Sequence, residues 1–469
     1  MISAEATSQQ SSRMPDCRGL DVTAGSALAV SAFDDAIRAF LRHGRDTPDH
    51  LKVAFGHDPD LTIAHAAKGL WSVLMGRREV LPVAKQALQD AKSSLSHRGG
   101  TAREHAFVAA LERAVVDDFN GAVVVLETSL AEQPHDALAM KLGHQMRFMT
   151  GDGPGMQQST ARHLAHWTKD MPDYGYLLGC HAFGLEETGS LEEAERAGRA
   201  AVEIEPEDAW GFHAVAHVFE VSDRPRDGVS WLVHHTPALK RSNNFAYHVF
   251  WHRALFHLTM GEIGTVLSLY DQSIRADKTD DFRDVANAVS LLWRLQAMGV
   301  DVGGRWGELA ELAERHIGDH AYGFADGHYL LALVGAGRDG AAARFVQSAA
   351  AANTVAPDGA IGHQPWVWRS IGCNLAEAIL AFGRGDDDGV ISALIGVRDR
   401  VHLLGGSNVQ RDVFELVILE AAVRSGNQSL ASSLMAERCR KRGDDGFTYR
   451  WGSPDDLATE PLLMAGAGI

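Results

Sequence analysis

The residues best suited to chemistry are histidines and one glutamate near the middle of the chain. The segment HAVAHVFE places His213 and His217 four residues apart, with Glu220 three residues later. The segment HVFWHRALFH places His248 and His252 at the same spacing. Residues three or four apart share one face of a helix, so each segment would present two imidazoles together. Eleven of the 23 histidines lie between positions 144 and 257, a density that a helical core does not require.

Three uses of this cluster remain open. Imidazoles at positions i and i+4 of a helix can hold one divalent metal ion, and the candidate ligands are His213, His217, His248 and His252. No other cofactor is predicted. The same side chains could perform general acid–base catalysis or bind a polar ligand, because imidazole titrates near neutrality and Glu220 could orient it. Alternatively, the histidines only satisfy buried hydrogen-bonding groups. The sequence therefore leaves open whether the protein is an enzyme.

Two later segments add polar residues at predicted helix starts. The segment FADGH contains Asp326 and His328, and the segment GGSNVQRD contains Gln410, Arg411 and Asp412. Polar residues at such positions usually cap helices. The run in the second segment is longer than one cap needs, and an arginine there could pair with a carboxylate or with a ligand. We therefore expect these five residues to be candidates for the far wall of a pocket that the histidines line.

A recurring turn organises most of the chain into pairs of helices. Ten Gly or Asp residues, spaced 34 to 48 positions apart, each separate two apolar helical segments. Gly adopts positive φ freely and Asp tolerates it, so this series indicates a turn of fixed geometry. The predicted turn residues are Gly76, Asp117, Gly151, Gly189, Asp223, Gly261, Gly299, Gly337, Gly385 and Gly426. The unit at residues 175–208 is close to the tetratricopeptide repeat (TPR) pattern.

This series predicts an all-α, TPR-like right-handed α-solenoid of about ten helix pairs, without a sheet. We expect a disordered N-terminal tail over residues 1–25, a single superhelical domain over residues 26–455, and a C-terminal tail over residues 456–469. The first helix of each TPR pair lines the concave groove. Counting back from the turns places His213, His217, Glu220, His248 and Trp251 in that groove, with His252 beside them.

Composition narrows the classes of partner. The 469-residue chain carries a net charge of −17, which disfavours binding to nucleic acids and to anionic membranes. Its four cysteines form no CxxC pair, and the N-terminal residues lack the apolar core of a signal peptide. We therefore predict a cytoplasmic protein whose partner is a small molecule or a peptide in the concave groove. A pure protein–protein interaction scaffold is the alternative.

Several segments together resemble the tetratricopeptide repeat protein 38 family, over about residues 50–440. They are AFGLEETGSLEEAE, DAWGFHAVAHVFE, YHVFWHRALFHLTMGE with LYD, RLQAMGVDVGGRW, FADGHYLLAL and GGSNVQRDVF. The resemblance supports the repeat fold and favours one composite pocket built from several helices. The residues that it implies are important are His213, His217, Glu220, His248, Trp251, His252, Asp271, Asp326, His328, Gln410, Arg411 and Asp412.

Overall fold

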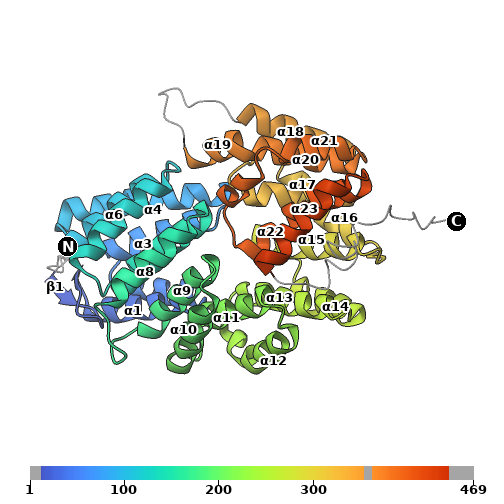
Figure 1. The fold of residues 1–469 in the computed structure, drawn as a ribbon. Helices are drawn as coiled ribbons and strands as arrows, with labels where there is room; N and C mark the ends of the chain where they lie inside the picture. Colours follow the sequence, from blue (N-terminus) through green and yellow to red (C-terminus); the bar gives the residue numbers. More distant parts are fainter. Residues whose placement is uncertain (1–11, 353–361, 443–469) are drawn as a thin grey trace. The chain divides into compact units, whose positions relative to one another are not determined.

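The computed structural model describes residues 12–352 and 362–442, and Figure 1 shows their helices. Over these ranges the chain is almost entirely helical, which confirms the predicted all-α helical-repeat fold. The chain divides into two compact units, described separately below: residues up to 215 with 237–243, and residues 216–236 with those from 244 onward. A single domain over residues 26–455 and the right-handed turn of the stack stay predictions, and the predicted C-terminal tail lies outside the described residues.

The first unit contains the N-terminal hairpin, two leading helices and four helix pairs. Its strands are β1 (Ser12–Pro15) and β2 (Asp21–Ala24), and its leading helices are α1 (Ala27–Leu41) and α2 (Thr47–His57). The pairs are α3 (Thr62–Leu74) with α4 (Leu81–Arg98), α5 (Ala102–Ala114) with α6 (Phe119–Glu132), α7 (Ala137–Thr150) with α8 (Gly153–Leu164), and α9 (Tyr174–Glu187) with α10 (Leu191–Ile204). The helix α11 (Ala209–Val221) begins in this unit and ends in the second.

The second unit continues the repeat through five further pairs after α11 and its partner α12 (Pro225–His235). They are α13 (Phe245–Thr259) with α14 (Ile263–Leu269), α15 (Phe282–Ala297) with α16 (Arg305–Arg315), α17 (Gly323–Gly335) with α18 (Asp339–Ala352), α20 (Cys373–Gly383) with α21 (Asp387–Leu394), and α22 (Asn408–Arg424) with α23 (Gln428–Arg442). The short helix α19 (His363–Val367) precedes α20. Residues 353–361, between α18 and α19, lie outside the described residues.

The predicted turns have the geometry that their residue types suggested. All ten Gly or Asp residues of the series adopt positive φ, from 51° at Asp223 to 85° at Gly189. Close packing explains the small residues near these turns. A Cβ at Gly69 would meet the side chain of Leu111, and a Cβ at Gly228 would meet the ring of Phe256. The sequence pattern therefore predicted where each helix pair turns, and these two glycines allow close packing between successive pairs.

The N-terminal segment differs from our expectation of a disordered tail, which is wrong for residues 12–25. These residues form the antiparallel hairpin β1–β2, and Val22 and Ala24 on it are fully buried. The backbone amide and hydroxyl of Thr23 donate to the carboxylate of Glu104 on α5, at 3.0 and 2.7 Å. The hairpin is the only sheet over residues 12–352 and 362–442, and it corrects the expectation of a chain without strands.

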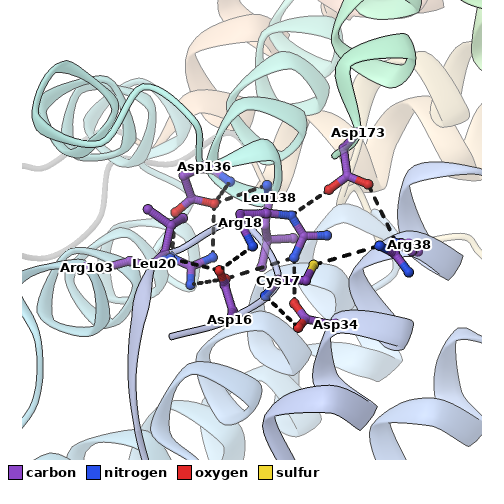
Figure 2. Close-up of polar contacts among 11 residues, drawn as sticks. Asp16, Cys17, Arg18, Leu20, Asp34, Arg38, Arg103, Asp136, Leu138 and Asp173 are labelled. Carbon is purple, nitrogen blue, oxygen red and sulfur yellow. Dashed lines mark hydrogen bonds and ion pairs between the residues drawn. The ribbon is translucent and has the colours of Figure 1, made fainter. Parts of the chain in front are cut away.

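Charged side chains fix the hairpin to the helices of the first unit (Figure 2). The guanidinium of Arg18 contacts Asp34 at 2.6 Å and Asp173 at 2.5 Å. The guanidinium of Arg103 contacts Asp16 at 3.0 Å and Asp136 at 2.7 Å. Both arginine side chains are 1% exposed. Arg18 lies in the hairpin loop and contacts two helical carboxylates, whereas Arg103 on α5 contacts Asp16 of the loop, so each guanidinium joins the hairpin to the helical body.

In the part of the chain that the structure describes, no helix is both long enough and apolar enough to cross a membrane.

Candidate functional site

The second unit contains a continuous chain of buried polar side chains, which we call the polar chain. It begins at Asn287 on α15, whose Oδ1 lies 2.9 Å from Nδ1 of His248. Nε2 of His248 lies 3.2 Å from Nε2 of His252, one turn later on α13. Nδ1 of His252 lies 2.9 Å from Oε2 of Glu220 on α11. The other carboxylate oxygen of Glu220 accepts a hydrogen bond from Arg442 at 2.8 Å. The polar chain therefore connects the Asn287 amide, through His248, His252 and Glu220, to the Arg442 guanidinium.

Beyond Glu220 the polar chain ends in a cluster of arginines around one aspartate. The carboxylate of Asp412 on α22 lies 3.1 Å from Nη2 of Arg294 and 2.8 Å from Nη1 of Arg442. Arg438 on α23 forms a third ion pair with the same carboxylate. Burial acts to raise the pKa of Asp412, but the three guanidiniums hold it well below its usual range. We call Arg294, Arg438, Arg442 and Asp412 the arginine cluster.

Burial controls the protonation of the imidazoles in the polar chain. It lowers the pKa of His248 to about 3, and burial together with His217 lowers the pKa of His252 well below its usual value. Both rings are therefore neutral near pH 7. Burial also raises the pKa of the Glu220 carboxyl, while the neighbouring Arg442 guanidinium opposes that change. These neutral imidazoles can bond to a metal ion or relay hydrogen bonds, but they carry no charge to offer an anion.

Two further residues predicted from the sequence, His217 and Trp251, lie against the polar chain. The ring centroid of His217 on α11 lies 4.6 Å from that of His252. The indole of Trp251 stacks on the His248 ring with centroids 5.3 Å apart. The guanidinium of Arg294 lies 5.9 Å from the centroid of the same indole. The structure thus brings six of the sequence candidates into one part of the second unit: His217, Glu220, His248, Trp251, His252 and Asp412. That they bind a ligand stays a prediction.

A small cavity lies at the arginine end of the polar chain. Its volume is about 30 Å³, enough for roughly two water molecules. Polar walls come from Glu220 and the arginine cluster, and Phe219, Leu255, Phe256 and Leu258 form an apolar wall. Asp223, Pro225 and Thr259 complete the lining. None of the three histidines lines this cavity, so Glu220 is the residue that connects it to the imidazoles.

Of the residues expected at the far wall, Asp412 lines the cavity, and the other four contribute neither to its lining nor to the polar chain. Asp326 faces His320, with Oδ2 and Nδ1 3.4 Å apart, and His328 bonds to the carbonyl of Phe324 in its own helix. Gln410 forms a capping box with Ser407 at the start of α22.

Arg411 donates to the carbonyls of the preceding glycine turn and to Oδ1 of Asn408. Asp271, which only the family resemblance implied, pairs with Arg305 at 2.7 Å and is half-exposed. His213 belongs to the first unit, where its ring lies 5.7 Å from that of Phe183 and 5.3 Å from that of Trp210. Three of the four predicted metal ligands, His217, His248 and His252, therefore belong to the second unit.

Sequence reasoning missed the three arginines that define the cavity. Arg294 lies seven residues after Asn287, so both side chains lie on the same face of α15. That spacing is the one signal that could have linked Arg294 to the histidines. Arg438 and Arg442 are four residues apart near the end of α23, where basic residues usually just complement the helix dipole.

The first unit holds a separate buried charge pair that the histidine pattern did not indicate. Nζ of Lys141 on α7 lies 4.5 Å from the ring centroid of Trp210 and 3.7 Å from Sγ of Cys180. The carboxyl of Asp208 is buried at the start of α11, against Gly179 and Gly211. Burial raises its pKa to about 7, although Lys141 acts in the opposite direction.

The raised pKa of Asp208 predicts a pH dependence of stability. The folded state holds the proton up to about pH 7, while the unfolded chain loses it near its ordinary value of 3.8. This group therefore stabilises the fold fully below pH 4, and that contribution is lost as the pH rises towards 7, by on the order of 1 kcal/mol per pH unit. Urea unfolding of the Asp208→Asn variant should give a flatter profile between pH 4 and 7. A profile identical to that of the unmodified protein would contradict the assignment.

Comparisons with solved structures give helical-repeat proteins. One is yeast Tom70, with a TM-score of 0.34 and 10% sequence identity, covering 92% of this chain and 95% of that chain. Another is the P58(IPK) TPR domain, with a TM-score of 0.22 and 13% identity, covering 76% of this chain and 98% of that chain. Because these scores are low, we infer no function from either protein. No protein-family model matches the chain, so membership of the tetratricopeptide repeat protein 38 family stays a prediction.

Proposed function

We propose that the second unit binds a small organic anion, with its carboxylate or phosphate group at the arginine cluster. The observation that supports this most is the convergence of three arginine side chains, 5%, 10% and 12% exposed, on one cavity. Asp412 and Glu220 pair with these guanidiniums and Asp223 also lines the cavity, so the guanidiniums are the cationic hydrogen-bond donors there that an anion would need. Guanidinium is also the side-chain group that recognises carboxylate and phosphate in a planar, bidentate manner.

The size and walls of the cavity limit the ligand. A volume of about 30 Å³ admits one small anionic group and not a whole metabolite, so the remainder of the ligand would project out of it. The apolar wall of Phe219, Leu255 and Phe256 favours an organic anion over inorganic phosphate, because these side chains offer no hydrogen bonds. Binding is better supported than acid–base catalysis, since the imidazoles do not line the cavity.

The alternative of a peptide scaffold has less support from the structure. Counting back from the turns also predicts Lys141, Tyr176 and Trp293 as groove positions, and a scaffold would depend on such positions. They are buried, at 1%, 6% and 6% exposure. Lys141 lies against Trp210 in the first unit, and Trp293 contacts Phe382 in the second. These side chains are thus already engaged by their own units. The absence of nucleic-acid partners and the cytoplasmic location stay predictions from composition.

The proposal predicts stabilisation by organic anions that depends on the cavity. A short-chain carboxylate or an alkyl phosphate at 100 times its dissociation constant should raise the free energy of unfolding by about 2.7 kcal/mol, and chloride at equal ionic strength should not. Thr259 lines the cavity, so Thr259→Trp should fill it and abolish the shift in melting temperature without removing a charge. Thr265→Trp on the exposed surface of α14 is the matched control. Equal stabilisation of both variants, or by chloride, would refute the pocket.

A further inference from the structure

The hydrogen-bond roles in the polar chain leave two lone pairs facing each other. Asn287 presents its carbonyl oxygen Oδ1 to Nδ1 of His248, and Glu220 presents a carboxylate oxygen to Nδ1 of His252. Both are acceptors, so both Nδ1 atoms must carry the proton. A neutral imidazole with a protonated Nδ1 has a lone pair on Nε2. The two Nε2 atoms lie 3.2 Å apart, so with these roles both are acceptors that a single cation could bond.

The separation of these nitrogens matches that of two ligands on one metal ion. Zinc bonds to imidazole nitrogen at about 2.0–2.1 Å in tetrahedral geometry, which places two ligand nitrogens about 3.3 Å apart. A third imidazole is in place, because His217, His248 and His252 each offer a ring nitrogen within 4.8 Å of the others. All three rings are buried, and they come from two helices of the second unit, α11 and α13.

We propose that His217, His248 and His252 bind one divalent transition-metal ion, with zinc the best match to the ligand set. The residues around them form the outer shell that such a site requires. Metal-bound histidine almost always donates its other N–H group to a carboxylate or carbonyl oxygen, as His252 does to Glu220 and His248 to Asn287. The Glu220 carboxylate also offsets the charge of the ion and lies between the imidazoles and Arg442.

A competing arrangement without metal is well defined. If the Asn287 amide is rotated so that Nδ2 faces His248, the amide donates to Nδ1, His248 donates through Nε2 to His252, and His252 donates to Glu220. Each contact along the polar chain then has one donor and one acceptor, and no cation is needed. Nitrogen and oxygen of an amide are assigned from exactly such networks, so this alternative is the one that an experiment must exclude.

The decisive measurement uses the full-length protein stripped with a chelator and titrated with Co²⁺. We expect about one equivalent to give the visible d–d absorption of a nitrogen-ligated site, and Zn²⁺ to displace it. His217→Ala and His252→Ala should each lose this absorption, while His402→Ala, which removes an exposed histidine of the same unit, should retain it. Asn287→Asp can only accept from His248, so it should retain metal within tenfold, whereas Asn287→Leu should weaken binding 10–100-fold.

The unmodified protein alone can overturn the proposal, even if a histidine variant fails to fold. No Co²⁺ absorption and no zinc after equilibration would establish the metal-free arrangement. Absorption that persists in both histidine variants would place the ion elsewhere. Neither result affects the anion proposal, because stabilisation by carboxylates depends on Thr259 and the arginine cluster and is measured with chelator present. The two proposals therefore fail independently.

Discussion

Asp412→Asn is expected to lower the free energy of unfolding by about 3–5 kcal/mol. The carboxylate of Asp412 contacts Arg294, Arg438 and Arg442, and its side chain is 6% exposed. An amide of the same shape keeps the volume but leaves three buried guanidiniums with Glu220 as the remaining carboxylate bonded to the cluster. Guanidinium-chloride unfolding followed by circular dichroism would measure the loss.

The matched control for this change is Asp271→Asn. Asp271 also makes two contacts with an arginine, at 2.9 and 2.7 Å to Arg305, but its side chain is 49% exposed. Solvent screening makes such surface pairs worth about 0–1 kcal/mol. If both variants lost the same small amount, burial of the arginine cluster would be of no energetic consequence. The guanidiniums on which the anion proposal depends would then be largely screened by solvent as well.

The repeat could be predicted from sequence because its determinants are local. Positive φ at a turn restricts one residue type at one position, and ten such positions at regular spacing leave little freedom in the fold. The same holds for His248 and His252, since four residues of helix fix the distance between their rings. Glu220 was found for the same reason, because it lies one turn after His217 on α11.

The arginine cluster could not be predicted in this way because its members are distant in sequence. Arg294, Asp412 and Arg442 lie on three helices, and no local spacing relates a residue of α15 to one of α23. Asp412 was predicted only as part of a polar run at a helix start. In that run, Gln410 and Arg411 satisfy local backbone and side-chain groups, and Asp412 alone reaches the cluster. Tertiary packing, rather than residue type, separates the three.

The same contacts change what one would expect of a Glu220 variant. From sequence, retention of stability with loss of binding in Glu220→Gln would have indicated a functional role, and loss of stability a structural one. Glu220 in fact bonds to His252 and to Arg442 at once. An amide cannot accept both bonds with the same strength, so stability and any binding would fall together. Thr259→Trp alters the cavity and Asn287→Leu alters the opposite end of the polar chain, so these two substitutions separate the two roles.

The N-terminal hairpin was also missed, because its stability comes from charges on distant helices. The first 25 residues carry Ser, Gln and Gly without periodicity, and they contain too few alternating apolar residues to indicate strands. Its partners, among them Glu104 and Arg103 on α5, lie some 80 residues later in the chain. Only the folded first unit brings these groups to the hairpin. The sequence of the segment alone therefore indicates disorder.

Arg103→Met is therefore expected to destabilise the first unit by about 3–5 kcal/mol and to release the hairpin. The substitution keeps an apolar chain of similar length but leaves Asp16 on the hairpin loop and Asp136 at the start of α7 without their shared guanidinium, at 3.0 and 2.7 Å. Limited proteolysis should then cut within residues 12–25 before the helical body. Arg113→Met on the same helix, whose side chain is 61% exposed beside Asp118, should cost no more than about 1 kcal/mol and leave the hairpin protected. Equal protection of the hairpin in both variants would show that its apolar residues, rather than the buried ion pairs, hold it to the helices.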